Sequence, residues 1–157
     1  MAKHELPTTH TERKSPRGLR THARRAALQA LYQWQMTGQD TDIVAVTFLE
    51  QWDFPVLNKD YFRELVREIP RSVPQLDDHL TPVVDRPLRQ IDPVERAILW
   101  IGTYELEFRS DVPWRVVVNE AVELAKSFGA EQSHKYVNGI LDKVAKKIRA
   151  SNPALRD

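Results

Sequence analysis

The residues of this sequence best suited to bind a ligand stand together near the start of one predicted helix. Lys135, Tyr136 and Asn138 supply a cation, an aromatic ring and an amide within a few positions of one another. Single-stranded RNA is bound by such groups, because cations contact phosphates, aromatic faces stack on bases and amides read base edges. The start of a helix adds backbone N–H donors that have no partner within the helix. These residues predict a surface that holds a polyanion.

A second set of cations lies at the start of the first predicted helix. It consists of Arg20, His22, Arg24 and Arg25. Arg20 and Arg24 continue the apolar stripe of that helix toward its N-terminus, beyond the point where a core could cover them, so they predict contacts with phosphates. The structural alternative stays open, in which this basic segment only solubilises the chain and Tyr136 belongs to the core.

Charge is distributed unevenly along the chain, although the net charge is only +1. Residues 1–26 carry seven basic and two acidic groups, and residues 140–157 carry five and two, so these ends hold +5 and +3. The segment between them must therefore hold −7. A cationic arm on an acidic body can hold a polyanion at one place and present carboxylates to a basic partner at another.

The motifs of the common enzyme classes do not occur in these 157 residues. There is no Walker loop, no G-x-G-x-x-G, no H-E-x-x-H and no serine in a nucleophile elbow, so we expect neither catalysis nor a cofactor. Asp77, Asp78 and His79 are adjacent and point around a helix, so we expect no metal site there. The absence of cysteine and of a long apolar run predicts a cytoplasmic protein that does not enter a membrane.

Apolar residues recur at helical spacing along most of the chain, and no alternating strand pattern of useful length occurs, so the predicted fold class is all-α. Residues 1–19 are predicted to be a disordered basic arm, and residues 151–157 a flexible tail. About seven helices are expected, over residues 20–37, 42–52, 59–69, 76–84, 93–108, 113–128 and from 131–134 to 148.

Local signals mark several boundaries within this pattern. Proline removes an amide donor, so Pro70 and Pro74 predict that the helix kinks or breaks before it resumes. Asp92 is predicted to cap a central, largely apolar helix, and Glu95 to return a bond to that cap. Gly102 is expected to let a neighbouring helix approach closely. The connection between about 85 and 90 is the predicted boundary of two subdomains, 20–85 and 90–150.

Four segments together resemble the NusB family of bacterial transcription antitermination factors. They are RRAALQALYQWQ, YELEFRSDVP, NEAVELAKSFGAE and SHKYVNGILDKVA, in that order. The resemblance covers about residues 20–148 and implies two small packed helical bundles in one domain, with no catalysis. It also implies binding of the boxA element of ribosomal leader RNA together with the ribosomal protein NusE, in a complex on RNA polymerase.

The resemblance carries over to individual residues. It places the RNA side on Arg20, His22, Arg24, Lys135 and Tyr136, and the side facing the protein partner near Tyr32, Met36 and Glu95. The arginine run of close relatives is thinner here around residues 19–22, so phosphate contacts are expected to shift to Arg13, Lys14 or Arg17. Asn138 joins the RNA side because of its amide.

Two other functions are also compatible with the sequence. One is a structural helical homodimer whose basic arm only solubilises it, and the other is a general helper of ribosomal RNA assembly. Some relatives self-associate, so the sequence leaves the choice between monomer and dimer undecided.

Overall fold

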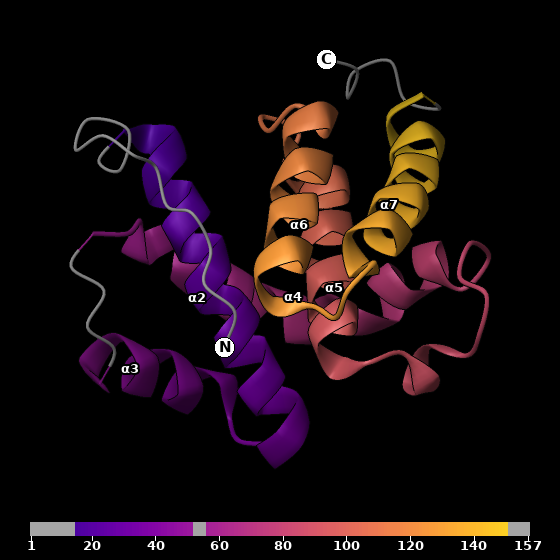
Figure 1. Cartoon of the computed structure of the whole chain (residues 1–157). Helices are drawn as coiled ribbons and strands as arrows, with labels where there is room; N and C mark the ends of the chain where they lie inside the picture. The colour runs from indigo at the N-terminus through magenta and orange to yellow at the C-terminus, as the bar shows by residue number, and fades with distance from the viewer. Residues whose placement is uncertain (1–14, 52–55, 151–157) are drawn as a thin grey trace. The chain divides into compact units, whose positions relative to one another are not determined.

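The computed structural model describes residues 15–51 and 56–150. Within these ranges the chain forms α-helices and one short 3-10 helix and contains no strand, which confirms the predicted all-α class (Figure 1). The elements are α2 (Pro16–Thr37), α3 (Thr41–Gln51), α4 (Lys59–Leu80), η1 (Leu88–Gln90), α5 (Pro93–Phe108), α6 (Trp114–Phe128) and α7 (Ser133–Ala150). These six α-helices are one fewer than the sequence predicted, because two predicted segments form a single helix.

The described residues divide into two compact units, 15–71 and 72–150. The sequence predicted subdomains of about 20–85 and 90–150, separated by the proline-containing connection. The division falls instead between Arg71 and Ser72, inside α4. The reason is that this helix is continuous and contributes residues to both units.

Helix α2 begins at Pro16, four residues earlier than predicted. The Oγ atom of Ser15 accepts a hydrogen bond from the Gly18 amide at 3.0 Å, which caps the helix. Proline fits the first helical position, because an amide there has no partner within the helix. The prediction of a disordered segment was therefore wrong for residues from Ser15 onward. The remaining arm, 1–14, and the predicted tail, 151–157, lie outside the described residues.

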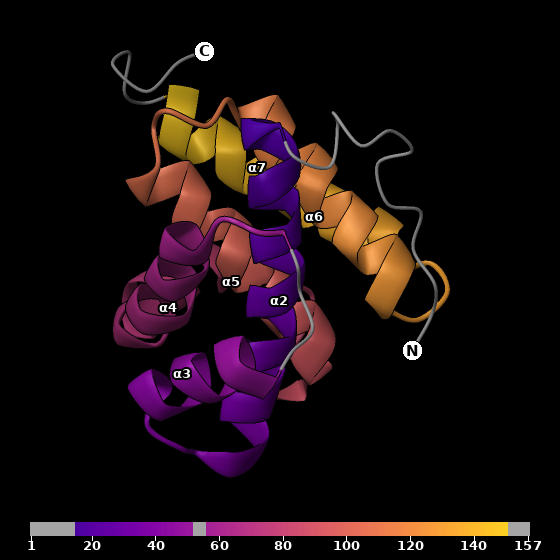
Figure 2. The same cartoon turned by 90° about the vertical axis from the view of Figure 1, so that its left-hand side faces the viewer.

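Helices α2 and α3 pack against each other in the first unit (Figure 2). Helix α3 buries Val44, Ala45 and Phe48. Ile43 and Val46 of the same helix are 57% and 53% exposed. Apolar residues occur on every side of this short helix, and its sequence alone could not show which side is covered.

Helix α4 runs through Pro70 and Pro74 without a break, so the predicted division into two helices was wrong. Each proline removes one helical hydrogen bond, and their spacing of four puts both on one side of the helix. A stripe of fully buried side chains continues past them, made of Phe62, Leu65, Val66, Ile69, Leu76 and Leu80. Packing along this stripe outweighs the local preference to end the helix.

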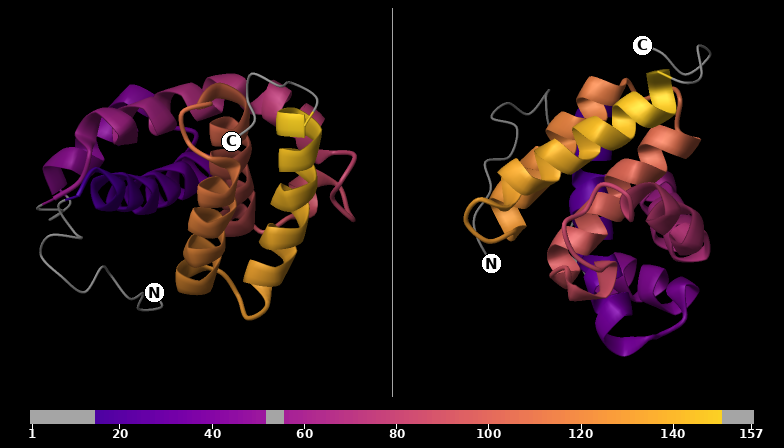
Figure 3. Two further views of the ribbon diagram at one scale, coloured as in Figure 1. Left: turned by 90° about the horizontal axis from the view of Figure 1, so that it is seen from above. Right: turned by 90° about the vertical axis from the view of Figure 1, so that its right-hand side faces the viewer.

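Helices α5, α6 and α7 pack against one another in the second unit (Figures 1 and 3). Helix α5 is its centre, since all ten residues from Ala97 to Leu106 are buried, as its nearly uniform apolar pattern predicted. The expected close approach at Gly102 is confirmed, because a Cβ atom there would lie 2.6 Å from Cδ1 of Leu141 in α7.

Side chains form hydrogen bonds with backbone groups at both ends of α5. At its start the carboxylate of Asp92 accepts hydrogen bonds from the amides of Val94 and Glu95, which confirms the predicted cap. Glu95, for which the sequence predicted a bond back to that cap, accepts a hydrogen bond from the Ser133 hydroxyl at the start of α7. The beginnings of α5 and α7 are thereby tied together.

At the end of α5, the guanidinium of the buried Arg149 donates to four backbone carbonyls at 2.8–3.2 Å. These carbonyls belong to Glu105, Leu106, Arg109 and Val112. The last carbonyls of a helix have no partner within it and carry partial negative charge, so a cation is favoured there. Arg149 thus fixes the turn between α5 and α6 onto α7.

Candidate nucleic-acid interface

The start of α7 is shaped by the turn that follows α6. A Cβ atom at Gly129 would lie 2.8 Å from Cβ of Ser133, so a larger residue could not fit without a shift. Gln132 has a φ of 73°, a value that side-chain-bearing residues rarely adopt. Its carbonyl accepts hydrogen bonds from the amides of Lys135 and Tyr136. This turn confirms the predicted break and presents the first residues of α7.

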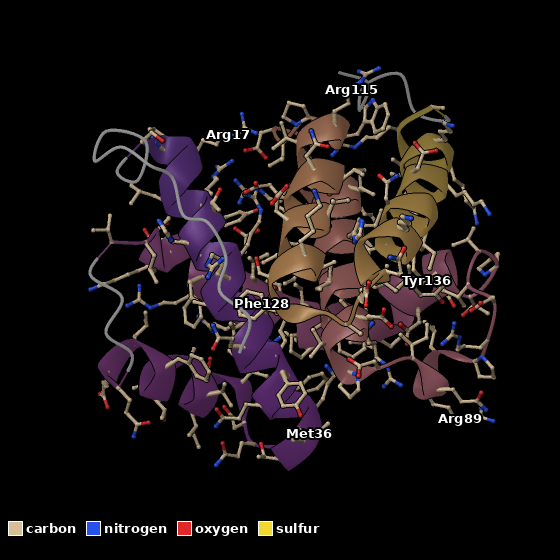
Figure 4. The ribbon with its side chains drawn as sticks, viewed as in Figure 1. Arg17, Met36, Arg89, Arg115, Phe128 and Tyr136 are labelled. Atoms are coloured by element: carbon tan, nitrogen blue, oxygen red, sulfur yellow. The ribbon has the colours of Figure 1, made fainter. Side chains whose placement is uncertain are left out.

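Tyr136, which Figure 4 labels, lies on α7. Two residues of the connection between α4 and α5 hold its side chain. Its hydroxyl donates a hydrogen bond to Oδ1 of Asp85 at 3.0 Å. The guanidinium of Arg86 lies 5.2 Å from the centroid of the tyrosine ring. Arg86 also donates to both carboxylate oxygens of Asp85, from Nε at 2.9 Å and from Nη2 at 3.2 Å. We call these three residues the Asp85–Arg86–Tyr136 cluster.

The charges in this cluster support one another. Burial, together with the bond to Asp85, raises the pKa of Tyr136, so its phenol stays protonated at neutral pH. Hydrogen bonds from Arg86 and from Tyr136 lower the pKa of Asp85. The carboxylate in turn raises the pKa of Arg86. At neutral pH the cluster therefore holds one negative and one positive charge beside a neutral ring.

Lys135 and Asn138 are exposed on α7 next to Tyr136, which is half-buried. Residues three positions apart are neighbours on a helix surface, so the ammonium and the amide share one face. Within the part of the chain that the structure describes, Lys135 forms no ion pair. Lys135 and Asn138 thus share an exposed face of α7, whereas the Tyr136 side chain contacts the connection between α4 and α5.

The cationic side chains of α2 differ in their exposure to solvent. Arg17 is exposed in the first turn (Figure 4), and Arg20 is half-buried with its guanidinium 4.9 Å from the centroid of the Tyr61 ring. Arg24 contacts the same ring at 5.6 Å, but it is only 2% exposed. His22 is also buried. Arg17 and Arg20 are therefore the more accessible members of this set, and an RNA contact by any of the four stays a prediction.

Exposed apolar side chains gather on the other predicted surface. Tyr32 and Met36, one helical turn apart on α2, are 41% and 53% exposed, and Met36 lies near the C-terminal end of that helix (Figure 4). Ile43 and Val46 of α3 are exposed as well. Glu95, the third predicted partner residue, is half-buried in the second unit. These observations leave the partner role itself a prediction.

Asp77 and His79 of the second unit contact separate partners. Asp77 accepts a hydrogen bond from Nε1 of Trp100 at 2.8 Å, and Nε2 of His79 lies 3.2 Å from the Glu107 carboxylate. Across residues 15–51 and 56–150, no three side chains of His, Asp or Glu are placed to hold a metal ion. No described helix is both long enough and apolar enough to cross a bilayer.

Comparison with known proteins identifies the family. The model of the NusB family matches residues 21–146. The chain belongs to the NusB family. It is 55% identical over 132 residues to the transcription antitermination protein NusB of Nitrosococcus oceani, which covers 84% of this chain and 88% of that relative.

Solved structures of NusB proteins share the fold. NusB of T. maritima superposes with a TM-score of 0.71 at 32% identity, over 85% of this chain and 93% of the other. A crystal structure of the antitermination factors NusB and NusE in complex with double-stranded RNA gives a TM-score of 0.68 at 25% identity, over 81% and 96% of the two chains. The all-α, NusB-like fold predicted from the sequence is confirmed.

Two residues at the predicted RNA side of this NusB-family chain were not singled out in the sequence. Asp85 and Arg86 lie in the predicted connection between about 85 and 90, and Asp85 is 51 positions from Tyr136 in the sequence. No linear spacing signals such a contact. Only the folded chain brings the connection beside the first turns of α7.

Proposed function

We propose that this chain is a non-enzymatic adaptor in transcription antitermination, which binds single-stranded, boxA-type RNA of ribosomal leader transcripts. The observation that carries the proposal is the start of α7, where exposed Lys135 and Asn138 accompany the half-buried ring of Tyr136. The Lys135 ammonium can bind a phosphate, the Asn138 amide a base edge and the Tyr136 ring the face of a base. The full set of proposed RNA contacts adds the α2 residues Arg17, Arg20, His22 and Arg24.

The same adaptor binds the ribosomal protein NusE in this proposal, through Tyr32, Met36 and Glu95. The exposed apolar side chains of Tyr32 and Met36 support such a contact, and Ile43 and Val46 could extend it. The net charge of −7 between the basic ends would attract a basic ribosomal protein. The resulting complex then joins RNA polymerase.

A binding titration tests both parts of the proposal. Single-stranded boxA RNA is added to the chain alone and to the chain with NusE. We expect NusE to raise the RNA affinity at least about fivefold, the lower end of typical coupling between two sites. A duplex of the same sequence should bind more weakly, because its stacked bases offer Tyr136 no free face. Equal RNA affinity with and without NusE contradicts the adaptor role.

A variant of the partner surface separates the two binding events. Met36→Asp places a charge among exposed apolar side chains and should abolish the gain from NusE. The RNA affinity of the variant alone should equal that of the wild type. A reduced RNA affinity without NusE would show that this surface serves the RNA and not the protein.

The exposed apolar side chains of α2 and α3 also favour a second candidate, a structural homodimer that covers them with another copy of the chain. Light scattering at two protein concentrations, with and without RNA, separates the two functions. A constant dimer mass with no RNA uptake supports the structural function. RNA binding that is independent of boxA sequence supports a general role in ribosomal RNA assembly.

A further inference from the structure

Arg86 has the geometry of an RNA-binding arginine. Its guanidinium lies 5.2 Å from the ring centroid of Tyr136, the residue proposed to stack on a base. The Arg86 side chain is 43% exposed, so its charge reaches solvent. A guanidinium that rests on an aromatic ring still points its N–H groups outward in its own plane, where they can donate to a phosphate.

Those N–H groups are engaged by Asp85 in the structure. Nε and Nη2 of Arg86 donate to the two oxygens of one carboxylate, which is the paired geometry that a phosphate also adopts with arginine. The hydroxyl of Tyr136 donates to the same carboxylate and helps to hold it in place. Asp85 therefore occupies the edge of the guanidinium that an RNA phosphate would use.

The ion pair can be displaced because it is exposed. The Asp85 side chain is 63% accessible to solvent, and exposed pairs between single charges are weak and screened by salt. The contact between the Arg86 guanidinium and the Tyr136 ring involves no atom of the carboxylate. When a phosphate replaces Asp85, the guanidinium can stay on the ring.

We propose that Arg86 is a further RNA-binding residue and that Asp85 restrains it in the free protein by competing with the RNA phosphate. The proposal rests on the proposed function, since the phosphate belongs to the strand whose base stacks on Tyr136. Binding exchanges one anion for another at Arg86, and no proton moves. Asp85 thereby lowers the affinity for RNA and leaves the surface selective for strands that also fill the Tyr136 site.

Two nearby residues supply matched controls. Arg89 of η1 is an exposed cation on the same connection (Figure 4), and among the described residues it forms no ion pair, so it has no carboxylate to exchange. Asp78 is an exposed carboxylate on α4 in the same unit. Asp78→Asn removes the same charge as Asp85→Asn, and Arg89→Gln removes the same charge as Arg86→Gln.

The experiment is a titration of single-stranded boxA RNA at several salt concentrations. We expect Asp85→Asn to bind about twofold to fivefold more tightly than the wild type, the range of an exposed charge pair. Arg86→Gln should bind more weakly and lower the salt slope by about 0.7, the value for one phosphate contact on a single strand. Asp78→Asn should bind like the wild type, and Arg89→Gln should lose less affinity than Arg86→Gln.

The double variant decides whether Asp85 acts through Arg86. If it does, Asp85→Asn adds no affinity in the Arg86→Gln background. An unchanged or lower affinity of Asp85→Asn, or a gain that persists in the double variant, overturns the inference. A wild-type chain that binds no RNA overturns the proposed function instead. Thermal unfolding of each variant verifies that these exposed substitutions leave the fold intact.

Discussion

In both units of the molecule an arginine guanidinium lies over a tyrosine ring. In the first unit Arg20 and Arg24 lie 4.9 and 5.6 Å from the centroid of Tyr61, which is only 3% exposed. In the second, Arg86 lies 5.2 Å from the centroid of Tyr136, which is half-buried. The contact distances are similar and the burial is not. Burial therefore distinguishes a tyrosine that belongs to the core from one that can meet a ligand.

The Arg20–Arg24–Tyr61 group of the first unit and the Asp85–Arg86–Tyr136 cluster of the second also differ in how easily an arginine can change its partner. Arg24 is buried with its charge, and a buried charge must keep its partners because it has no access to water. Arg86 and Asp85 are both exposed, so water or a competing anion can replace either partner at little free-energy cost. We infer that Arg24 and Tyr61 mainly stabilise the first unit, and that Arg86 can exchange Asp85 for another anion.

Truncation of the two tyrosines gives the largest expected contrast. Tyr61→Ala empties a buried aromatic site and should lower the free energy of unfolding by about 3–5 kcal/mol. Tyr61→Phe keeps the ring and should lower it by about 1 kcal/mol or less. Urea denaturation measures both. If Tyr61→Ala proves no more destabilising than Tyr136→Ala, Tyr61 does not contribute to the core in the way its burial implies.

Arg149 is another buried arginine, and it binds the C-terminal end of α5. Arg149→Met removes the donor for four backbone carbonyls, so we expect the free energy of unfolding to fall by about 2–4 kcal/mol. The exposed Lys143 on the same helix is the control, and Lys143→Met should change stability by less than about 0.5 kcal/mol. Equal effects of the two substitutions in chemical denaturation would show that the carbonyls find other donors.

Arg20 and Arg24 contact the same Tyr61 ring. Their substitutions should separate an effect on stability from an effect on RNA binding. Arg24→Gln, at the buried position, should lower the free energy of unfolding by about 1–3 kcal/mol. Arg20→Gln should change it by less than about 0.5 kcal/mol and should lower the salt slope of RNA binding by about 0.7. Denaturation and salt-dependent titrations measure these quantities. The reverse order of destabilisation contradicts the assignment by burial.

The smallest expected effect is on the titration of Tyr136. Its pKa is raised from 10.0, chiefly by burial and then by the bond to Asp85. The folded state therefore favours the protonated phenol, and this stabilisation is complete below pH 10 and is lost as the pH rises through the raised pKa. NMR of the tyrosine ring carbons should show that Asp85→Asn lowers this pKa only in part, because burial remains. A value unaffected by Asp85→Asn would show that the hydrogen bond contributes nothing.

Helices and caps of this chain are predictable because their signals are local. The aspartate and proline at positions 92 and 93 mark the start of α5, and Gly38, with a φ of 68°, ends α2. The nearly uniform apolar pattern of residues 97–106 likewise identifies α5 as the central helix. The start of α2 was missed because residues 16–19 show no apolar period, although Ser15 and Pro16 carry a capping signal.

Tertiary contacts decided the features that the sequence could not give. Pro70 and Pro74 predict an interruption by local chemistry, and burial of the α4 stripe overrides it. At the candidate site, the position of Lys135, Tyr136 and Asn138 near the start of one helix was predictable from the sequence. The burial of His22 and Arg24 was not, because it depends on what covers α2. The approach of the 81–92 connection to Tyr136 also needs the folded chain.

The most direct test of the account is the RNA affinity of Tyr136→Ala, measured together with its free energy of unfolding. We expect single-stranded boxA RNA to lose about 1–3 kcal/mol of binding free energy, the usual effect of removing one base–aromatic stack. The free energy of unfolding should change by no more than about 1 kcal/mol, because the ring is only half-buried. Tyr61→Phe, with its buried ring kept, should bind RNA like the wild type. A folded Tyr136→Ala chain with wild-type RNA affinity would contradict the account.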